Sequence, residues 1–275
     1  MAAITFLNQK GGVGKTSSVF HLSGSLARSG RRVLVVDTDP QGSLTQGFFG
    51  PEGMRALRTE QTVAALFVPG AEPMPEALIR PTGVDGVAIV PGSAHLYRVN
   101  RLPDEVDPET WQGLRSFLGA VRGEYDLILI DCPPNLQLCS WAALVASDAI
   151  VVPLQAEDFG SQGLIPVQDA IAAVREGPNP RLRLAGFLLT MFDRRLAVHL
   201  AYETMLRRLY GPAVFAASVP RAKDFVEAVA NRRPIAALKP RCAAAQALEG
   251  VMTELLERVG LAEAATTTGI ERGAA

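Results

Sequence analysis

The sequence predicts an α/β fold with a doubly wound, mostly parallel β-sheet and helices on both faces. Three observations lead to this prediction. Short apolar, β-branched runs alternate with segments whose apolar residues recur at helical spacing. Several of these runs are almost continuously apolar, as expected of strands that helices cover on both sides. A glycine-rich loop joins the first run to the first helical segment, which gives the order strand, turn and helix.

The strands are predicted from their shortness and their β-branched content, which favour a buried strand over a helix. In chain order they are residues 4–7, 32–36, 86–90, 127–130, 149–154, 184–190 and 213–217.

Four helices are predicted from apolar residues that share one face. The first follows Lys15, and Gly30 lies where a C-terminal cap is needed. Ser161 is expected to cap the second, in which Pro166 is tolerated because it lies near the start. The four apolar faces consist of Val19, Leu22 and Leu26; of Leu164, Val167, Ile171 and Val174; of Leu196, Leu200 and residues 206–209; and of Leu248, Val251, Leu255 and Val259.

Two irregular, proline-containing segments interrupt this pattern, at residues 68–75 and 103–108. Because β-α units continue on both sides without a shift in composition, we expect surface loops and not domain linkers. The sequence therefore predicts one domain over residues 1–261, followed by a flexible C-terminal tail over 262–275.

Composition narrows the class of protein. The chain has 275 residues, with 27 Lys+Arg and 28 Asp+Glu, and a net charge of −1. This balance excludes nucleic-acid binding through bulk positive charge and leaves local basic clusters open. Three cysteines are too few and too scattered for a disulfide framework or a zinc cluster. Neither a signal peptide nor a membrane-spanning run is recognisable, so we expect a cytoplasmic protein that does not bind membranes.

The most informative segment is Lys10-Gly11-Gly12-Val13-Gly14-Lys15-Thr16, between a strand and a helix. Its glycines let the backbone turn N–H groups toward phosphate oxygens, and the following helix presents its positive dipole end to the same anion. Lys15 is placed to reach the β- and γ-phosphates, and the Thr16 hydroxyl to ligate Mg²⁺. The predicted nucleotide-binding residues of this loop are Gly11, Gly12, Val13, Gly14, Lys15, Thr16 and Ser17.

Lys10 is an additional lysine, and Gln9 replaces the first glycine of the standard pattern. A second ammonium exceeds what ground-state binding of one triphosphate requires. It becomes useful when it stabilises charge that develops during phosphoryl transfer, or reaches a partner's nucleotide. On the loop alone, a solvated surface lysine remains the alternative.

Five further segments accompany the glycine loop, at residues 35–42, 128–134, 152–157, 189–193 and 219–221. In this order, and over about residues 3–259, the six segments resemble the motifs of the ParA/MinD family of deviant Walker A ATPases. The loop resembles their Walker A motif and residues 128–134 their Walker B motif, and the chain is most similar to the short, Soj-like ParA proteins. The resemblance implies a P-loop fold, ATP and ADP with Mg²⁺ as ligands, and ATP hydrolysis.

Three aspartates are candidates for the chemistry of such a hydrolase, which holds Mg²⁺ beside the γ-phosphate and aligns a water. Asp131 closes an apolar strand, where a charge needs partners, and this favours a place in the Mg²⁺ shell with Thr16. The resemblance implies that Asp39 positions or activates the attacking water. It also implies that Asp37 helps to organise the metal, with a turn-forming aspartate before Pro40 as the alternative.

The resemblance further implies an ATP-bound homodimer in which Lys10 reaches the partner's phosphates, so that Lys10, Lys15 and Asp39 form the catalytic set. A ligand shared between two copies drives assembly because it prefers the dimeric state. Loops at Met191 and at Pro220 and Arg221 are expected to flank the adenine.

ParA dimers commonly bind DNA without sequence preference, and local basic clusters make this chain a candidate. Such phosphate contacts weaken with salt. Asp224 stands where Soj-like chains carry an arginine thought to touch DNA, and solvated helix faces remain the alternative for each cluster. The residues expected to contact DNA are Arg195, Arg221, Lys223, Arg232 and Arg233.

We therefore expect a slow, partner-stimulated, nucleoid-associated ATPase that partitions chromosome or plasmid DNA through a ParB-like partner. The alternatives are a positioning ATPase for a protein cargo, a nucleotide-stabilised adaptor without hydrolysis, and a P-loop kinase or ligase for a small metabolite. A MinD-like membrane-associated regulator is disfavoured because residues 262–275 lack a basic amphipathic helix. An iron–sulfur relative is disfavoured because Cys132 and Cys139 do not form the cysteine pair that it needs.

Overall fold

The computed structural model describes residues 1–156 and 164–262 and confirms the predicted α/β class. Seven strands form one sheet in the order β3-β4-β2-β5-β1-β6-β7. All neighbours pair in parallel except β3, which runs antiparallel to β4 at one edge. The strands are β1 (Ala2–Phe6), β2 (Val33–Asp37), β3 (Arg80–Pro81), β4 (Val87–Val90), β5 (Leu127–Asp131), β6 (Ala149–Gln155) and β7 (Arg183–Thr190).

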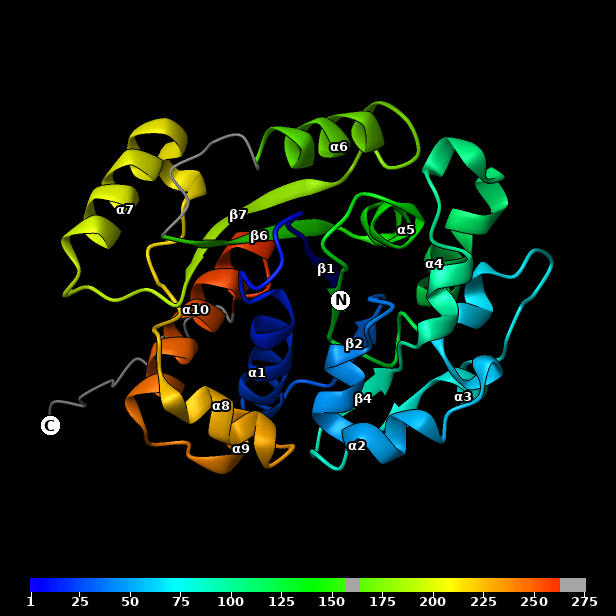
Figure 1. Ribbon diagram of the computed structural model, residues 1–275, viewed down its shortest axis with the longest axis horizontal. Coiled ribbons are helices and arrows are strands. Elements are labelled where there is room, and N and C mark those ends of the chain that lie inside the picture. The colour runs from blue at the N-terminus through cyan, green and yellow to red at the C-terminus, as the bar shows by residue number, and fades with distance from the viewer. Residues whose placement is uncertain (157–163, 263–275) are drawn as a thin grey trace, which may run out of the picture.

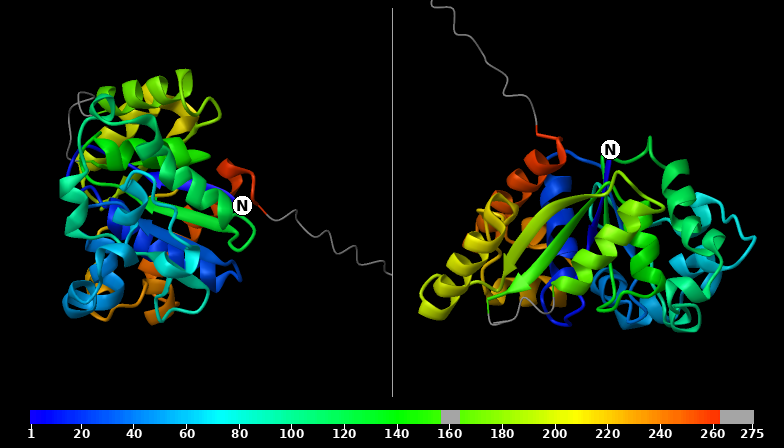
Figure 2. Two further views of the ribbon diagram at one scale, coloured as in Figure 1. Left: turned by 90° about the vertical axis from the view of Figure 1, so that its right-hand side faces the viewer. Right: turned by 90° about the horizontal axis from the view of Figure 1, so that it is seen from above.

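Helices cover both faces of the sheet, because successive residues of the central strands point to opposite sides. Ile4 and Phe6 of β1 belong to a core with α1, α2, α8, α9 and α10, whereas Ala3 and Leu7 belong to a core with α4, α5, α6 and α7. Figure 2 shows green helices above the sheet and blue and orange helices below it in its left view. The helices are α1 (Lys15–Arg28), α2 (Ser43–Arg55), α3 (Pro75–Leu78), α4 (Pro108–Ala120), α5 (Leu138–Ala146), α6 (Ile165–Glu176), α7 (Ala197–Tyr210), α8 (Lys223–Ala230), α9 (Ile235–Leu238) and α10 (Ala243–Val259).

The four predicted helices correspond to α1, α6, α7 and α10. The predicted cap of α1 is confirmed: Gly30 has φ +86°, and its N–H donates to the Ala27 carbonyl at 2.9 Å. The next N–H, that of Arg31, donates to Leu26 at 3.2 Å. A left-handed glycine with this pair of bonds satisfies the last carbonyls of a helix.

The predicted strand over residues 213–217 is wrong. Val214 forms only an isolated bridge with Phe187 of β7. From α10, the Glu254 carboxylate accepts hydrogen bonds from two N–H groups of this segment, at 2.9 and 2.8 Å, and Arg258 donates to the Val214 carbonyl at 3.1 Å. Side chains of a distant helix therefore occupy backbone groups that a ladder would have used.

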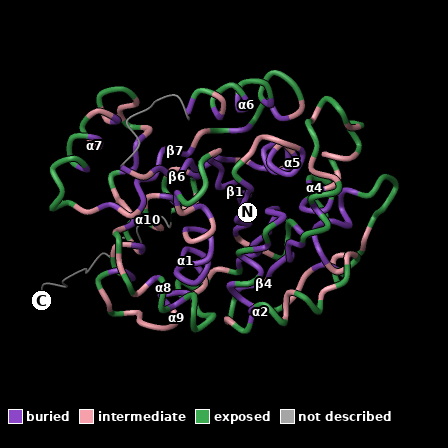
Figure 3. Tube along the Cα trace, in the orientation of Figure 1, coloured by how far each residue is buried: buried purple, intermediate pink, exposed green. Residues whose placement is uncertain are grey.

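The two proline-containing segments, residues 68–75 and 103–108, lie at the surface as predicted. Figure 3 shows burial concentrated along the strands and on the inner sides of the helices. No helix within residues 1–156 and 164–262 is both long and apolar enough to cross a bilayer. Glu157, the predicted cap Ser161 and residues 263–275 of the predicted tail lie outside the described residues.

Candidate active site

The candidate site lies at the C-terminal edge of the sheet, where β1, β2 and β5 end side by side. Phe6 pairs with Asp131, and Asp37 pairs with Asp131 from the other side. The glycine loop that follows β1 leads directly into α1, near the centre of Figure 1. Parallel α/β sheets bind ligands at this edge because their loops and helix N-termini converge there. The topology thus brings together motifs that are more than 100 residues apart.

The glycine loop provides an open cradle. Gly12 and Gly14 have φ angles of +78° and +84°, which favour glycine. A Cβ atom at Gly11 or Gly12 would meet nothing within 4 Å, whereas one at Gly14 would lie 3.4 Å from the Cβ of Thr190. The loop therefore faces free space on one side and is packed against β7 on the other.

The two lysines of the loop lie differently. Lys15 is 6% exposed, and its ammonium donates to the carbonyl of Lys10 at 3.0 Å. Burial lowers the pKa of Lys15, while the charge of Asp131 opposes this shift. Lys10 is exposed, and its N–H donates to the buried Asn8 carboxamide at 2.9 Å. Both the N–H and the carbonyl of Lys10 are thus hydrogen-bonded within the loop, and the residue is exposed at the surface.

Two further residues hold the glycine loop. Both lie in segments that the sequence marked as family-like, but the sequence assigned neither of them a role. The Thr190 hydroxyl, at the end of β7, donates to the Val13 carbonyl at 2.8 Å. The Gln155 amide, at the end of β6, donates to the Gly12 carbonyl at 3.2 Å. The available signal was a polar residue at the end of an apolar strand, as for the aspartates.

Asp131 is fully buried, and neither of its carboxylate oxygens has a hydrogen-bond partner among the described residues. Burial raises its pKa well above the usual range, and the neighbouring Asp37 adds to the rise. The Thr16 hydroxyl is the first group that opposes this shift, although its geometry falls short of a hydrogen bond. A buried carboxylate without partners is costly, and a cation removes that cost.

Asp37 differs from Asp131 although the two residues are neighbours. Its carboxylate accepts hydrogen bonds from the N–H and the hydroxyl of Thr45, at 2.8 and 2.6 Å, and from the N–H of Asp39 at 3.2 Å. These bonds hold the first turn of α2. Burial nevertheless raises its pKa. Asp39 is 8% exposed, and its carboxylate accepts a hydrogen bond from the N–H of Gln41 at 2.8 Å.

The donor set fits Mg²⁺ bound together with phosphate oxygens. Asp131 supplies unpartnered oxygens, and the half-buried Thr16 lies in the first turn of α1. Within the described part of the chain, no group of three or more His, Cys, Asp or Glu residues forms a preformed metal cluster. Mg²⁺ typically takes one or two protein ligands plus water and substrate phosphates, and so does not need such a cluster.

The residues expected to flank adenine lie beside the loop. Met191 has φ +50°, and its sulfur contacts the Gln155 amide at 2.9 Å. The next residue, Phe192, pairs with Pro220, and its carbonyl accepts from the Arg221 N–H at 3.4 Å. The structure thus places the two predicted adenine loops next to each other.

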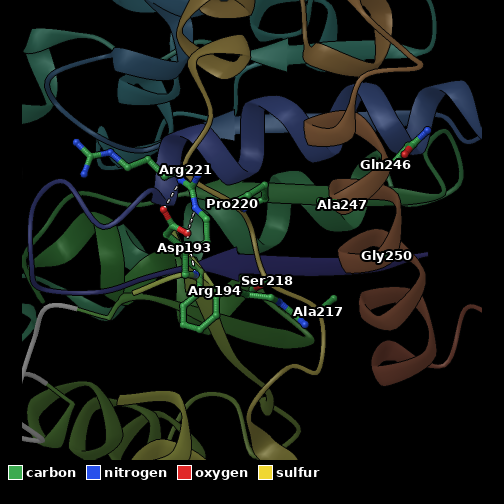
Figure 4. A pocket seen from close by; sticks show the side chains of 11 residues that line it. Asp193, Arg194, Ala217, Ser218, Pro220, Arg221, Gln246, Ala247 and Gly250 are labelled. Carbon is green, nitrogen blue, oxygen red and sulfur yellow. Dashed lines mark hydrogen bonds and ion pairs between the residues drawn. The ribbon is translucent and has the colours of Figure 1, made fainter. Parts of the chain in front are cut away.

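A pocket of about 540 Å³ opens beyond these loops, between residues 192–195, the turn at 217–221 and α10. Figure 4 shows Asp193, Arg194 and Arg221 around it. Arg195 lines the same pocket and forms a two-point ion pair with Asp193, at 2.9 and 2.7 Å. Two of the predicted DNA-contacting residues, Arg195 and Arg221, therefore share one pocket.

The other three predicted DNA contacts lie at the two ends of α8. Lys223 begins the helix and is exposed, whereas Arg232 packs against Gly50 of α2 and Arg233 donates to the Ala237 carbonyl at 3.0 Å. Asp224 stands where Soj-like chains carry an arginine thought to touch DNA. Its carboxylate forms an ion pair with Lys239 at 3.1 Å. Its charge is therefore partly compensated.

Comparison with known proteins agrees with this geometry. A family model described as an AAA domain matches residues 1–184. The chromosome partitioning protein ParA of Caulobacter vibrioides is 34% identical over 260 residues, which cover 94% of this chain and 95% of that protein. The chromosome-partitioning ATPase Soj of Thermus thermophilus is 38% identical over 257 residues, with coverage of 93% and 96%.

A solved structure is also similar. It is a cobyrinic acid a,c-diamide synthase from Mycobacterium smegmatis with a bound ATP analog and magnesium, at a TM-score of 0.72 and 30% identity. The match covers 84% of this chain and 91% of that one. Together with the glycine loop and the three aspartates, these matches show that the chain belongs to the ParA/Soj family of chromosome-partitioning ATPases.

Proposed function

We propose that this chain is a Mg²⁺-dependent ATPase that dimerises on ATP, binds DNA non-specifically and partitions a DNA cargo through a ParB-like partner that stimulates hydrolysis. The observation that carries the proposal is the buried, unpartnered carboxylate of Asp131 beside an open glycine loop. A cation and an anion together would satisfy both features, and a magnesium–nucleotide complex supplies both.

In the proposed mechanism, the N–H groups of the glycine loop and Lys15 bind the phosphates. Lys15 exchanges its contact with the Lys10 carbonyl for a phosphate oxygen. Thr16 and Asp131 would hold Mg²⁺, which when bound offsets negative charge on the phosphate oxygens. Asp39 orients the attacking water with the carboxylate that the Gln41 N–H holds in place.

The remaining aspartate and the adenine loops have supporting roles in this proposal. Asp37 acts on the metal indirectly, because its oxygens are engaged by Thr45 and by the Asp39 N–H, and so it fixes the start of α2. Met191, Pro220 and Arg221 flank the base next to Gln155.

Lys10 provides the link from ATP to dimerisation in this proposal. Its N–H donates to the buried Asn8 carboxamide, a bond that remains when Lys15 turns to the phosphates, and the residue is exposed at the surface. A cation placed in this way can reach phosphates of a second copy, and a shared ligand favours the dimer. DNA contacts by Arg195, Arg221 and Lys223 would then be doubled, with Arg232 and Arg233 at the far end of α8.

The name of the mycobacterial structure suggests a second activity, ATP-dependent amide formation. Enzymes of that kind that take nitrogen from glutamine use a reactive thiol. Cys132 and Cys139 are buried, and burial raises the pKa of both thiols. The third cysteine, Cys242, is half-buried. ATP hydrolysis is the proposed reaction because the chain matches a partitioning ATPase over 93% of its length, against 84% for the mycobacterial structure.

The test is binding to non-specific duplex DNA with ATP, ADP or no nucleotide, with sedimentation of the same samples. We expect ATP and Mg²⁺ to give a dimer that retains DNA at low salt, with log K falling by about 0.9 per phosphate contact for each log unit of salt. Lys10→Ala should keep nucleotide binding and remain monomeric.

Paired variants provide the control for DNA binding. Arg221→Ala/Lys223→Ala should weaken retention, whereas Arg181→Ala/Arg183→Ala, with the same change in charge at the start of β7, should not. A lack of ATP-dependent retention at low salt would contradict the DNA-binding step, and unchanged dimerisation of Lys10→Ala would contradict its assigned role.

A further inference from the structure

A groove runs beside α4, on the side of the molecule opposite α7 and α8 in Figure 1. Its larger part has a volume of about 620 Å³ and lies between α4 and the segment 66–75. Leu66, Pro69 and Phe117 line it, and Val68, also in the lining, is 49% exposed. A second hollow of about 390 Å³ continues from it, because Pro69 and Thr110 line both. The groove is thus large and partly apolar.

Exposed carboxylates surround this groove. Only one cation, Arg101, is among the residues that line either part, all of which are described. None of Glu72, Asp104, Asp107 and Glu109 forms an ion pair within the described residues. Unpaired charges of one sign along a concave surface raise the local concentration of oppositely charged partners. The carboxylates that line the groove are Glu72, Asp104, Glu105, Asp107 and Glu109.

We propose that this groove binds a segment of the cargo adaptor that combines Lys or Arg with apolar anchor residues. The proposal rests on the proposed function, because it assigns the place where the stimulating partner docks. Apolar anchors would fill the floor at Leu66 and Phe117, and the basic side chains would meet the carboxylate rim. Charge complementarity of this kind fixes orientation and speeds association.

The location keeps the two proposed partners apart. Figure 1 places α3 and α4 at the right of the molecule, and α7 and α8 at the left. The residues proposed for DNA lie at α8 and at the loop before α7. An adaptor in the groove and DNA on the basic side would therefore not compete for one surface.

Asn100 connects the groove to the loop that follows Asp131. Val99 and Arg101 line the second hollow, on either side of Asn100. The Asn100 carboxamide accepts from the Cys139 N–H at 3.0 Å and donates to the Gln137 side chain at 3.0 Å. An occupant that shifts residues 99–101 would pull on residues 137–139, and so on the loop that begins at Asp131. Asn100 is therefore a positioning residue that would carry partner stimulation to the site.

The first experiment measures docking without nucleotide, so that it does not depend on hydrolysis. The probes are a labelled 15-residue peptide of Leu and Lys at helical spacing and the same peptide with Glu in place of Lys, in fluorescence anisotropy with the full chain. We expect the Lys peptide to bind and Glu72→Lys/Asp104→Lys to weaken it at least tenfold. The control is Asp169→Lys/Glu176→Lys on α6, which makes the same change in charge on exposed residues and should weaken binding far less.

Several results would overturn docking in the groove. If the groove variant and the α6 control variant weakened binding of the Lys peptide equally, the peptide would be attracted only by the net charge of the chain. If the Glu peptide bound as tightly as the Lys peptide, the carboxylates of the groove would not contribute to recognition. If the groove variant kept peptide affinity but lost ATP-dependent dimerisation in sedimentation, the occupant would be a second copy of the chain.

The second experiment tests the link through Asn100. Saturating Lys peptide should raise kcat for ATP with little change in KM, and Asn100→Ala should bind the peptide normally while losing this increase. No effect of the peptide on wild-type kcat, or a full effect in Asn100→Ala, would overturn the link. A chain that binds the peptide but hydrolyses no ATP would contradict the proposed function and leave the groove assignment standing.

Discussion

Replacement of Asp131 by Asn gives the sharpest test of the site, because the structure predicts a more stable but inactive protein. Asp131 is fully buried with both oxygens unpartnered, and Asp37 next to it adds like charge. Burial and repulsion both disfavour the ionised form. Lys15 opposes them, but it retains its own bond to the Lys10 carbonyl. Because the cost of burial and repulsion exceeds the gain from Lys15, a neutral residue of the same shape should raise the folding stability.

The size and the pH dependence of the change in folding stability follow from this balance. An uncompensated buried ion costs several kcal/mol, and after the offset from Lys15 we expect Asp131→Asn to stabilise the apoprotein by about 1–2 kcal/mol. For a domain of this size that is about 2–8 °C in Tm. Because the pKa of Asp131 is raised in the folded state, folding stability is lost as the pH rises above the usual carboxyl range. The gain should therefore be larger at pH 8 than at pH 5.

The assay is thermal unfolding in EDTA at pH 5 and pH 8, followed by hydrolysis of Mg-ATP. Asp126→Asn is the matched control, since Arg32 lowers the pKa of this partly exposed carboxyl to about 2, and its contribution to stability is lost only as the pH falls through that value. Its effect should be the same at pH 5 and pH 8. A lower Tm for Asp131→Asn, or a gain that does not grow with pH, would refute the reasoning. Wild-type hydrolysis by the variant would refute the magnesium role.

Substitutions at three further positions test the other parts of the site. Lys15→Ala should lose nucleotide binding, measured by the fluorescence of a labelled ATP analogue, and affinity within threefold of wild type would contradict its phosphate contact. Asp39→Ala should bind ATP, dimerise and remain on DNA, because only the water is disturbed; phosphate release at the parental rate would disprove its catalytic assignment. Thr190→Val leaves the Val13 carbonyl without its bond and should cost about 1–3 kcal/mol in urea unfolding. Thr190→Ser should restore the bond, and equal loss in both variants would point to packing instead.

Local sequence patterns were sufficient to predict an element where nearby residues determine its conformation. The central strands β1, β2 and β5 appear as apolar runs because both of their faces are buried. The glycine loop could be predicted because Gly12 and Gly14 need left-handed backbone angles. Residues 213–217 carry a similar apolar run and are nevertheless no strand, because Glu254 and Arg258 lie about forty residues further along the chain.

The sequence by itself determined the fold class, which depends on short-range patterns. It also indicated the candidate site residues, the glycine loop by its spacing and the three aspartates with the help of the family resemblance. Only the tertiary structure distinguished Asp37, whose oxygens are occupied, from Asp131, whose oxygens are not. In the same way, it paired Asp224 with Lys239 and placed the acidic groove beside α4, on the side opposite the residues proposed to contact DNA. The physical reason is that the charge state and availability of a side chain depend on partners that the chain supplies from distant positions.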